Sequence, residues 1–167
     1  MLVNGVKYAA DTYVAYVARA EIYFAEKPAR EAKREAERKA WEIRENFTIE
    51  NGVLVEYKGK DWAVVIPEGV TSIGEYAFRY CTGLTTVIYN SNQNIPTDMF
   101  YNCTSVAKYD FRNANAVLTL EKTTHLGHAT GCKIVVPDTL YDSWKAATNW
   151  SALTDVVWVK ASEYTEG

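Results

Sequence analysis

The sequence has no long uninterrupted run of apolar residues. Its 167 residues are 48% hydrophobic and 23% charged, which is typical of a globular protein. A membrane-spanning helix needs about 18 or more predominantly apolar residues, and no stretch approaches that length. The N-terminal residues 1–8 also lack the basic leader and continuous apolar core of a secretory signal. We therefore expect no membrane partner and a virion or cytoplasmic location.

Neither sign of charge dominates the chain. The formal net charge is −3, and residues 61–167 carry 7 Lys/Arg against 11 Asp/Glu. A balance so close to zero favours neither a nucleic-acid binder nor a nucleic-acid mimic. The length fits one domain with a sizeable core, or one solenoid with capped ends.

Catalytic motifs are missing as well. The chain contains no P-loop, no G-x-G-x-x-G, no H-E-x-x-H and no G-x-S-x-G. His125, His128 and Cys132 have a spacing that supplies three metal ligands, but the fourth ligand is absent and Cys132 also fits a core position. We expect no enzyme, no catalytic residue, no cofactor and no metal site.

A repeat is what the sequence does contain. Residues 66–87 form one unit, and a weaker copy follows directly. Five pairs of residues are each 22 positions apart: Ile73 and Ile95, Phe78 and Phe100, Cys81 and Cys103, Thr82 and Thr104, Leu84 and Val106. Self-similarity at such a period predicts a solenoid whose units bury their apolar faces against each other. The two equivalent cysteines favour a stack of buried thiols over a disulfide.

The unit resembles the BspA-like leucine-rich repeats of bacterial surface proteins and some phage proteins, with the pattern IPxxVxxIGxxAFxxCxxLxxVxI. Residues 66–87 match it nearly completely, and residues 89–111 match it in part. The resemblance implies a short strand stacked on its neighbours, a helical turn on the opposite side and a cysteine that points into the core.

Short strands are expected in one parallel ladder near residues 64–66, 87–89, 109–111 and 134–136. The first and last residues of each are predicted to point inward, and Val65, Ile88 and Val135 to form an apolar stripe outside. Phe78, Phe100, Cys81 and Cys103 are expected in the core. Asn51-Gly52 predicts a hairpin turn within residues 47–57, whereas residues 113–132 depart from the repeat and are expected to form a loop.

Two helices are predicted before the repeats, as an N-terminal helical hairpin. Residues 8–26 have a broad apolar face that we expect to be docked, and Pro28 fits the first turn of a second helix with a seam of alanines. The charges of that second helix are interpreted as intrahelical pairs, with a basic contact surface as the alternative. After the repeats, residues 137–150 predict a helix capped by Asp138, and residues 156–159 a last strand, together closing the solenoid with three tryptophans.

The predicted fold class is therefore α+β: a short leucine-rich-repeat-like solenoid with a helical segment at residues 1–46 and the repeats and cap at 47–167. Tyrosine and tryptophan are abundant, 12 and 5 residues, and suit interfaces as well as cores. We expect contacts with a partner through these residues: Tyr13, Val17, Phe24, Tyr76, Arg79, Tyr80 and Tyr101.

Two functional hypotheses follow. The first is a non-catalytic protein-interaction or assembly module, a phage or bacterial structural component that binds other proteins or its own copies. The alternative is a small inhibitor encoded by a mobile element, which docks on an intracellular host enzyme or defence complex.

Overall fold

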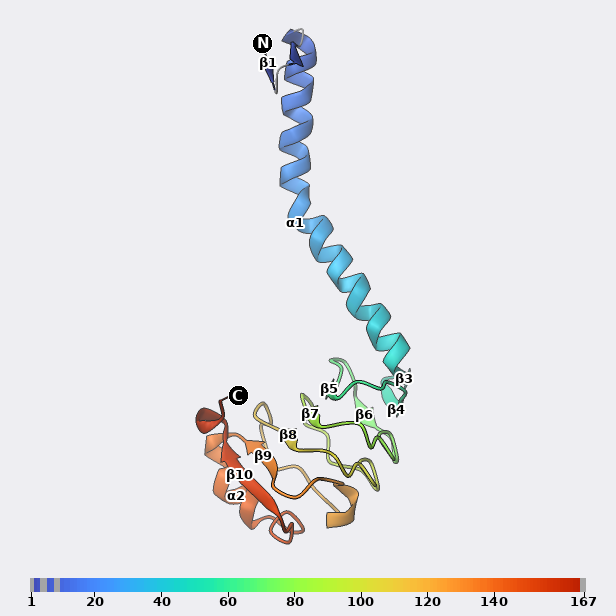
Figure 1. Ribbon diagram of the computed structural model, residues 1–167, viewed down its shortest axis with the longest axis vertical. Helices are drawn as coiled ribbons and strands as arrows, with labels where there is room; N and C mark the ends of the chain where they lie inside the picture. Colours follow the sequence, from blue (N-terminus) through green and yellow to red (C-terminus); the bar gives the residue numbers. More distant parts are fainter. Residues whose placement is uncertain (1, 4–5, 8–9, 166–167) are drawn as a thin grey trace. The chain divides into compact units, whose positions relative to one another are not determined.

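The structure is a computed structural model that describes residues 2–3, 6–7 and 10–165, with side chains from residue 14 onward. The chain divides into two compact units, residues 1–42 and 43–167. A long helix dominates the first unit, and strands and turns dominate the second, so the chain is α+β (Figure 1). No helix in the described part of the chain is both long and apolar enough to cross a membrane.

A parallel five-stranded sheet runs through the second unit (Figure 1). Its strands are β5 (Ala63–Val65), β7 (Thr86–Ile88), β8 (Lys108–Asp110), β9 (Cys132–Val136) and β10 (Val156–Lys160). They lie side by side in chain order. Val64 pairs with Val87, Val87 with Tyr109, and Tyr109 with Ile134. The predicted parallel ladder is confirmed, and β10 adds a fifth strand to it.

The inward face of this ladder is the one the sequence predicts. All eight expected residues are buried: Val64, Ile66, Val87, Tyr89, Tyr109, Phe111, Ile134 and Val136. The expected outer stripe is only partly present. Val65 is 49% exposed, but Val135 is fully buried, so that prediction was wrong for Val135. Its neighbours in register are Val159 and Asp110, and Asp110 is held by Arg112, so side chains surround it on both sides.

The predicted hairpin joins strands β3 (Phe47–Glu50) and β4 (Val53–Tyr57). Asn51 and Gly52 have φ of 51° and 82°, the two positive values that a type I′ turn requires. Strand β4 also pairs in parallel with β6 (Ser72–Ile73), a contact that the sequence did not predict. The hairpin therefore extends into a three-stranded sheet with the first repeat.

The turn segments between the strands are linked from repeat to repeat as well. The Phe78 N–H donates to Met99 O at 2.9 Å, and the Phe100 N–H donates to His125 O at 3.1 Å. Residues 113–132, predicted as a loop, contain the 3-10 helix η1 (Thr123–His125) and take part in this stacking. Isolated parallel bridges join Ile95 to Leu120, and Phe100 to Leu126.

Aromatic rings form a chain through the core. Successive ring centroids lie 5.1 to 6.0 Å apart along this path: Phe47, Tyr57, Phe78, Phe100, Tyr109, Phe111 and Trp144. Phe78, Phe100 and Cys103 are fully buried as predicted. Cys81 packs against the core but is only half-buried, so the prediction that it is buried was wrong. It lines a hollow of about 320 Å³ beside residues 57–61, where no complete repeat precedes it.

The C-terminal cap has the predicted helix and last strand, but the helix is shorter than the predicted residues 137–150 at both ends. It contains the 3-10 helix η2 (Asp138–Leu140), helix α2 (Tyr141–Ala146) and the 3-10 helix η3 (Ala161–Glu163). Trp144 and Trp150 are buried against Phe111. The predicted cap by Asp138 is wrong. Its carboxylate instead accepts hydrogen bonds from the N–H and Oγ–H of Ser162, and these bonds lower the pKa of Asp138.

A single helix, α1 (Ala10–Asn46), replaces the predicted helical hairpin, and that prediction was wrong. Pro28 lies inside α1 instead of opening a second helix. Proline removes one backbone hydrogen bond and bends a helix, and Figure 1 shows a bend part-way along α1. No glycine or other turn residue flanks Pro28, and Ala, Glu, Lys and Arg around it favour helix, so the helix continues. Before α1, strand β1 (Leu2–Val3) pairs antiparallel with β2 (Val6–Lys7).

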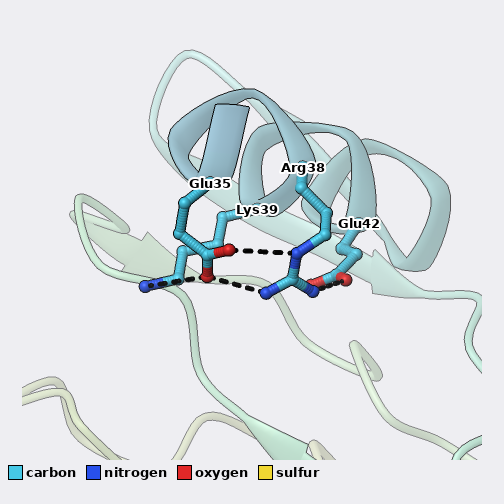
Figure 2. A network of polar contacts seen from close by, with 4 residues as sticks. All are labelled: Glu35, Arg38, Lys39 and Glu42. Carbon is cyan, nitrogen blue, oxygen red and sulfur yellow. Dashed lines mark hydrogen bonds and ion pairs between the residues drawn. The ribbon is translucent and has the colours of Figure 1, made fainter. Parts of the chain in front are cut away.

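Charged side chains of α1 pair along the helix, as predicted. Figure 2 shows Arg38 in contact with both Glu35 and Glu42, and Lys39 in contact with Glu35. The hydrogen bond from Arg38 lowers the pKa of Glu35. All four side chains are largely open to solvent, so water and salt screen these pairs and they add little stability.

Candidate functional site

Three tyrosines surround one arginine on the turn segments of the first two repeats. The Arg79 guanidinium carbon lies 4.7 Å from the ring centroid of Tyr80, 5.0 Å from that of Tyr76 and 5.5 Å from that of Tyr101. Arg79 also donates a hydrogen bond of 3.1 Å to the Tyr80 hydroxyl. We call these four residues the Arg79 cluster. The sequence predicted each of them as a contact residue, and the structure places them together.

The repeat geometry explains why they meet. Tyr80 and Tyr101 lie on consecutive repeats, and the Tyr80 N–H donates to Tyr101 O at 2.9 Å. Their rings meet edge to face with centroids 5.8 Å apart. The tyrosines are 39% to 54% exposed, unlike the buried rings of the core. An aromatic cluster that stays in solvent is available to a partner.

The backbone beneath the cluster is unusual for tyrosine. Tyr76 has φ of 64° and Tyr80 has φ of 62°, both in the left-handed region. The equivalent positions 22 residues later also have positive φ but hold Asp98 and Asn102. Asn and Asp tolerate this conformation better than an aromatic residue does. The tyrosines of the first repeat therefore carry backbone strain of about 1–2 kcal/mol per residue.

The Arg79 cluster combines residue types that are common in protein interfaces. Tyr and Arg are enriched where proteins bind each other, because a rigid ring buries a large area and keeps a polar group for hydrogen bonding. A guanidinium held by rings presents its N–H groups with little loss of side-chain freedom.

The remaining predicted contact residues lie on α1. Phe24 is 67% exposed, and Val17 is partly buried. The backbone of Tyr13 belongs to α1, but its side chain lies outside the described ones. Further exposed apolar residues of this helix are Val14 (68%), Ile22 (56%), Tyr23 (51%) and Tyr16 (49%). The first helical segment was expected to be docked, whereas the structure leaves much of its apolar surface open to solvent.

The histidine segment does not assemble a shared site. The side chain of His125 is buried, and its Nε2 lies 3.6 Å from Asp98 Oδ1. The ring nitrogens of His128 instead face the carbonyl oxygens of Leu126 and Thr154, at 2.8 and 3.3 Å. Burial raises the pKa of the Cys132 thiol to about 12. Across the described residues, no three His, Cys, Asp or Glu side chains are grouped to hold a metal ion.

The sequence missed one property of the Arg79 cluster, namely its left-handed backbone. The signal was available, because Tyr76 and Tyr80 align with Asp98 and Asn102 at the 22-residue period. Asp and Asn at fixed offsets in one repeat mark positions that favour positive φ. Tyrosine at the same positions of the first repeat is therefore an exception to this preference.

A family model described as "BspA type Leucine rich repeat region (6 copies)" matches residues 56–144, from within β4 to within α2. Neither the curated proteins nor the solved structures contain a match to the chain.

Proposed function

Since the chain belongs to the BspA-type leucine-rich repeat family, we propose that it is a non-catalytic assembly module in a phage or bacterial structure. Leucine-rich repeats generally mediate protein–protein interaction, so its partners are proteins. In this proposal the parallel ladder and its turn segments form a short solenoid that α2 and β10 close at one end. A solenoid presents extended surfaces, which fits binding better than catalysis.

The observation that carries the proposal is the Arg79 cluster. Exposed tyrosines surround Arg79, and two of them have a positive φ that Asn, Asp or Gly adopts with less strain. Neither the core nor the ladder needs these side chains, because Phe78 and Phe100 fill the interior beneath them. Contact with a protein partner supplies a reason for their presence.

In this proposal the N-terminal and C-terminal segments have different roles. Residues 1–46 contain the assembly helix, and residues 47–167 contain the partner-binding repeats. Val14 and Phe24 are more than 65% exposed, and such an apolar helix surface is stabilised when a second copy covers it. The protein then forms a homo-oligomer through α1 and presents several copies of the Arg79 cluster.

Solution mass tests the assembly role. Light scattering during gel filtration is expected to give a defined oligomer for the full chain and a monomer after deletion of residues 1–27. A double substitution, Val17→Glu with Phe24→Glu, is expected to act like the deletion. Arg34→Glu, on the same helix, serves as the matched control and keeps the oligomer. A full-length protein that is monomeric at all concentrations contradicts the assembly role and supports the inhibitor instead.

Partner capture tests the Arg79 cluster. Structural proteins from the same virion or cell surface are expected to co-purify with the full chain, and to be lost with Arg79→Ala and with Tyr101→Ser. Tyr141→Ser, which changes a partly buried tyrosine of the cap, is the control. Equal capture by all variants contradicts the role of the cluster.

A further inference from the structure

The outer face of the ladder carries a groove that the sequence did not indicate. Its lining residues are Trp62, Ala63, Thr86, Ile88, Ala107, Lys108, Gly131, Lys133 and Tyr164, around a volume of about 550 Å³. One edge is apolar, because it is formed by the side chain of Trp62, which is 69% exposed. The opposite edge is basic, with Lys108, Lys133 and the ring of Tyr164.

The two lysines are brought together by strand register. Lys108 on β8 pairs directly with Lys133 on β9 in the parallel ladder. Neighbouring strands lie about 4.8 Å apart, and like charges directly opposite each other destabilise a sheet. Neither lysine has a carboxylate within ion-pair distance among the described residues. No carboxylate of the described residues therefore offsets the repulsion between Lys108 and Lys133.

Tyr164 gathers the positive charge at this edge. Lys108 Nζ lies 4.8 Å from its ring centroid, Arg112 Cζ 5.3 Å and Lys133 Nζ 5.8 Å. These are three of the seven Lys/Arg residues in a segment, 61–167, with an excess of acidic residues. The Arg112 guanidinium is paired with buried Asp110 at 2.6 Å, so the positive charge that faces the groove comes from the two lysines.

We propose that this groove binds an extended acidic peptide segment of a protein partner. A carboxylate of the peptide sits between Lys108 and Lys133, where it relieves their repulsion and forms charge-assisted hydrogen bonds. A neighbouring apolar side chain packs on Trp62 and Ile88, and the row Ala63, Thr86, Lys108 and Lys133 leads from one contact to the other. The groove is a second contact surface, separate in residues from the Arg79 cluster.

Charge complementarity favours a peptide over a nucleic acid. Two lysines on an acidic segment provide a small positive area, whereas nucleic-acid binding uses a wide basic surface and many phosphate contacts. One or two carboxylates match two ammonium groups. The proposal rests on the proposed function only in taking the partner to be a protein.

Fluorescence anisotropy with a labelled model peptide tests the groove without knowledge of the partner. The probe is a ten-residue peptide of alternating Glu and Leu, and the matched probe has Gln in place of each Glu. The full-length protein is expected to bind the Glu peptide in low salt and to bind the Gln peptide about tenfold more weakly. A tenfold loss of affinity corresponds to about 1.4 kcal/mol, which is the expected contribution of the charge interaction. Added salt is expected to weaken only the Glu peptide.

Substitutions locate the binding. Lys108→Gln combined with Lys133→Gln is expected to reduce the affinity for the Glu peptide about tenfold or more. Trp62→Ala is expected to weaken both peptides. Lys122→Gln, at an exposed lysine of the 113–132 segment, is the control and leaves binding unchanged. Circular dichroism of each variant confirms that the fold is retained.

Three results overturn the inference: equal binding of the Glu and Gln peptides, full binding by the double lysine variant, or displacement of the peptide by single-stranded oligonucleotide at lower concentration than by unlabelled peptide. The last result assigns the groove to nucleic acid. Any of these leaves the proposed function standing if deletion of residues 1–27 still abolishes the oligomer.

Discussion

Phe100 provides the most direct test of how the repeats are held together. Its side chain is fully buried, and its ring lies 5.1 Å from that of Phe78 on the preceding repeat and 5.1 Å from that of Tyr109. Phe100→Ala removes both contacts and leaves a cavity in the middle of the aromatic chain. Substitutions of this kind cost about 3–5 kcal/mol. This is a large part of the roughly 5–15 kcal/mol by which a typical domain is stable.

The measurement is unfolding followed by tryptophan fluorescence, because Trp144 and Trp150 are buried in the second unit and report on it. A loss of about 3–5 kcal/mol lowers the melting temperature by roughly 6–20 °C in a chain of this size. Tyr101→Ala is the adjacent control. Tyr101 is 39% exposed, so its removal is expected to cost about 1 kcal/mol or less. Wild-type-like melting of Phe100→Ala, or an equal loss for Tyr101→Ala, refutes the reasoning.

Three further experiments test other parts of the fold. Gly127→Ala is expected to lower the free energy of unfolding strongly in a urea titration, because the added Cβ would lie 2.5 Å from the Phe100 carbonyl oxygen. Wild-type stability of this variant would contradict the close backbone contact. Tyr80→Asn is expected to melt at or above the wild-type temperature, because asparagine tolerates the positive φ of this position. Tyr80→Val is expected to melt below it, because a β-branched residue tolerates positive φ least. The reverse order would show that the backbone at Tyr80 is not strained. At pH 8, iodoacetamide followed by mass spectrometry is expected to label Cys81 before Cys132. The neighbouring Cys103 side chain lowers the pKa of half-buried Cys81, whereas burial raises the pKa of Cys132 to about 12. Equal labelling of Cys81 and Cys132 would contradict this difference in reactivity.

The repeat made much of the second unit predictable. A 22-residue period requires that equivalent apolar residues face the same way, and burying them against each other leaves one register for neighbouring strands. This is why Val87 and Tyr109, which are 22 residues apart, align as expected. The hairpin at Asn51-Gly52 was equally predictable, because the turn depends on two adjacent residues.

Predictions failed where a residue's surroundings do not repeat. Cys81 has the sequence of a core cysteine, but residues 57–61 before it are not a complete repeat and leave it half-open. Asp138 has the position of a helix cap, but Ser162 offers it two hydrogen-bond donors from the end of the chain. Pro28 was interpreted as a helix start, whereas the helix-favouring residues on both sides extend α1 through it.

The candidate sites show the same division. The sequence alone placed Tyr76, Arg79, Tyr80 and Tyr101 on the turn segments, because their distance from Phe78 and Phe100 in the repeat sets which way they face. Only the tertiary structure decided that Lys108 and Lys133 meet at the ring of Tyr164. These residues are far apart in sequence and outside the buried pattern. Burial of apolar side chains imposes a period that can be read along the chain, whereas contacts between surface side chains depend on where the folded backbone brings them.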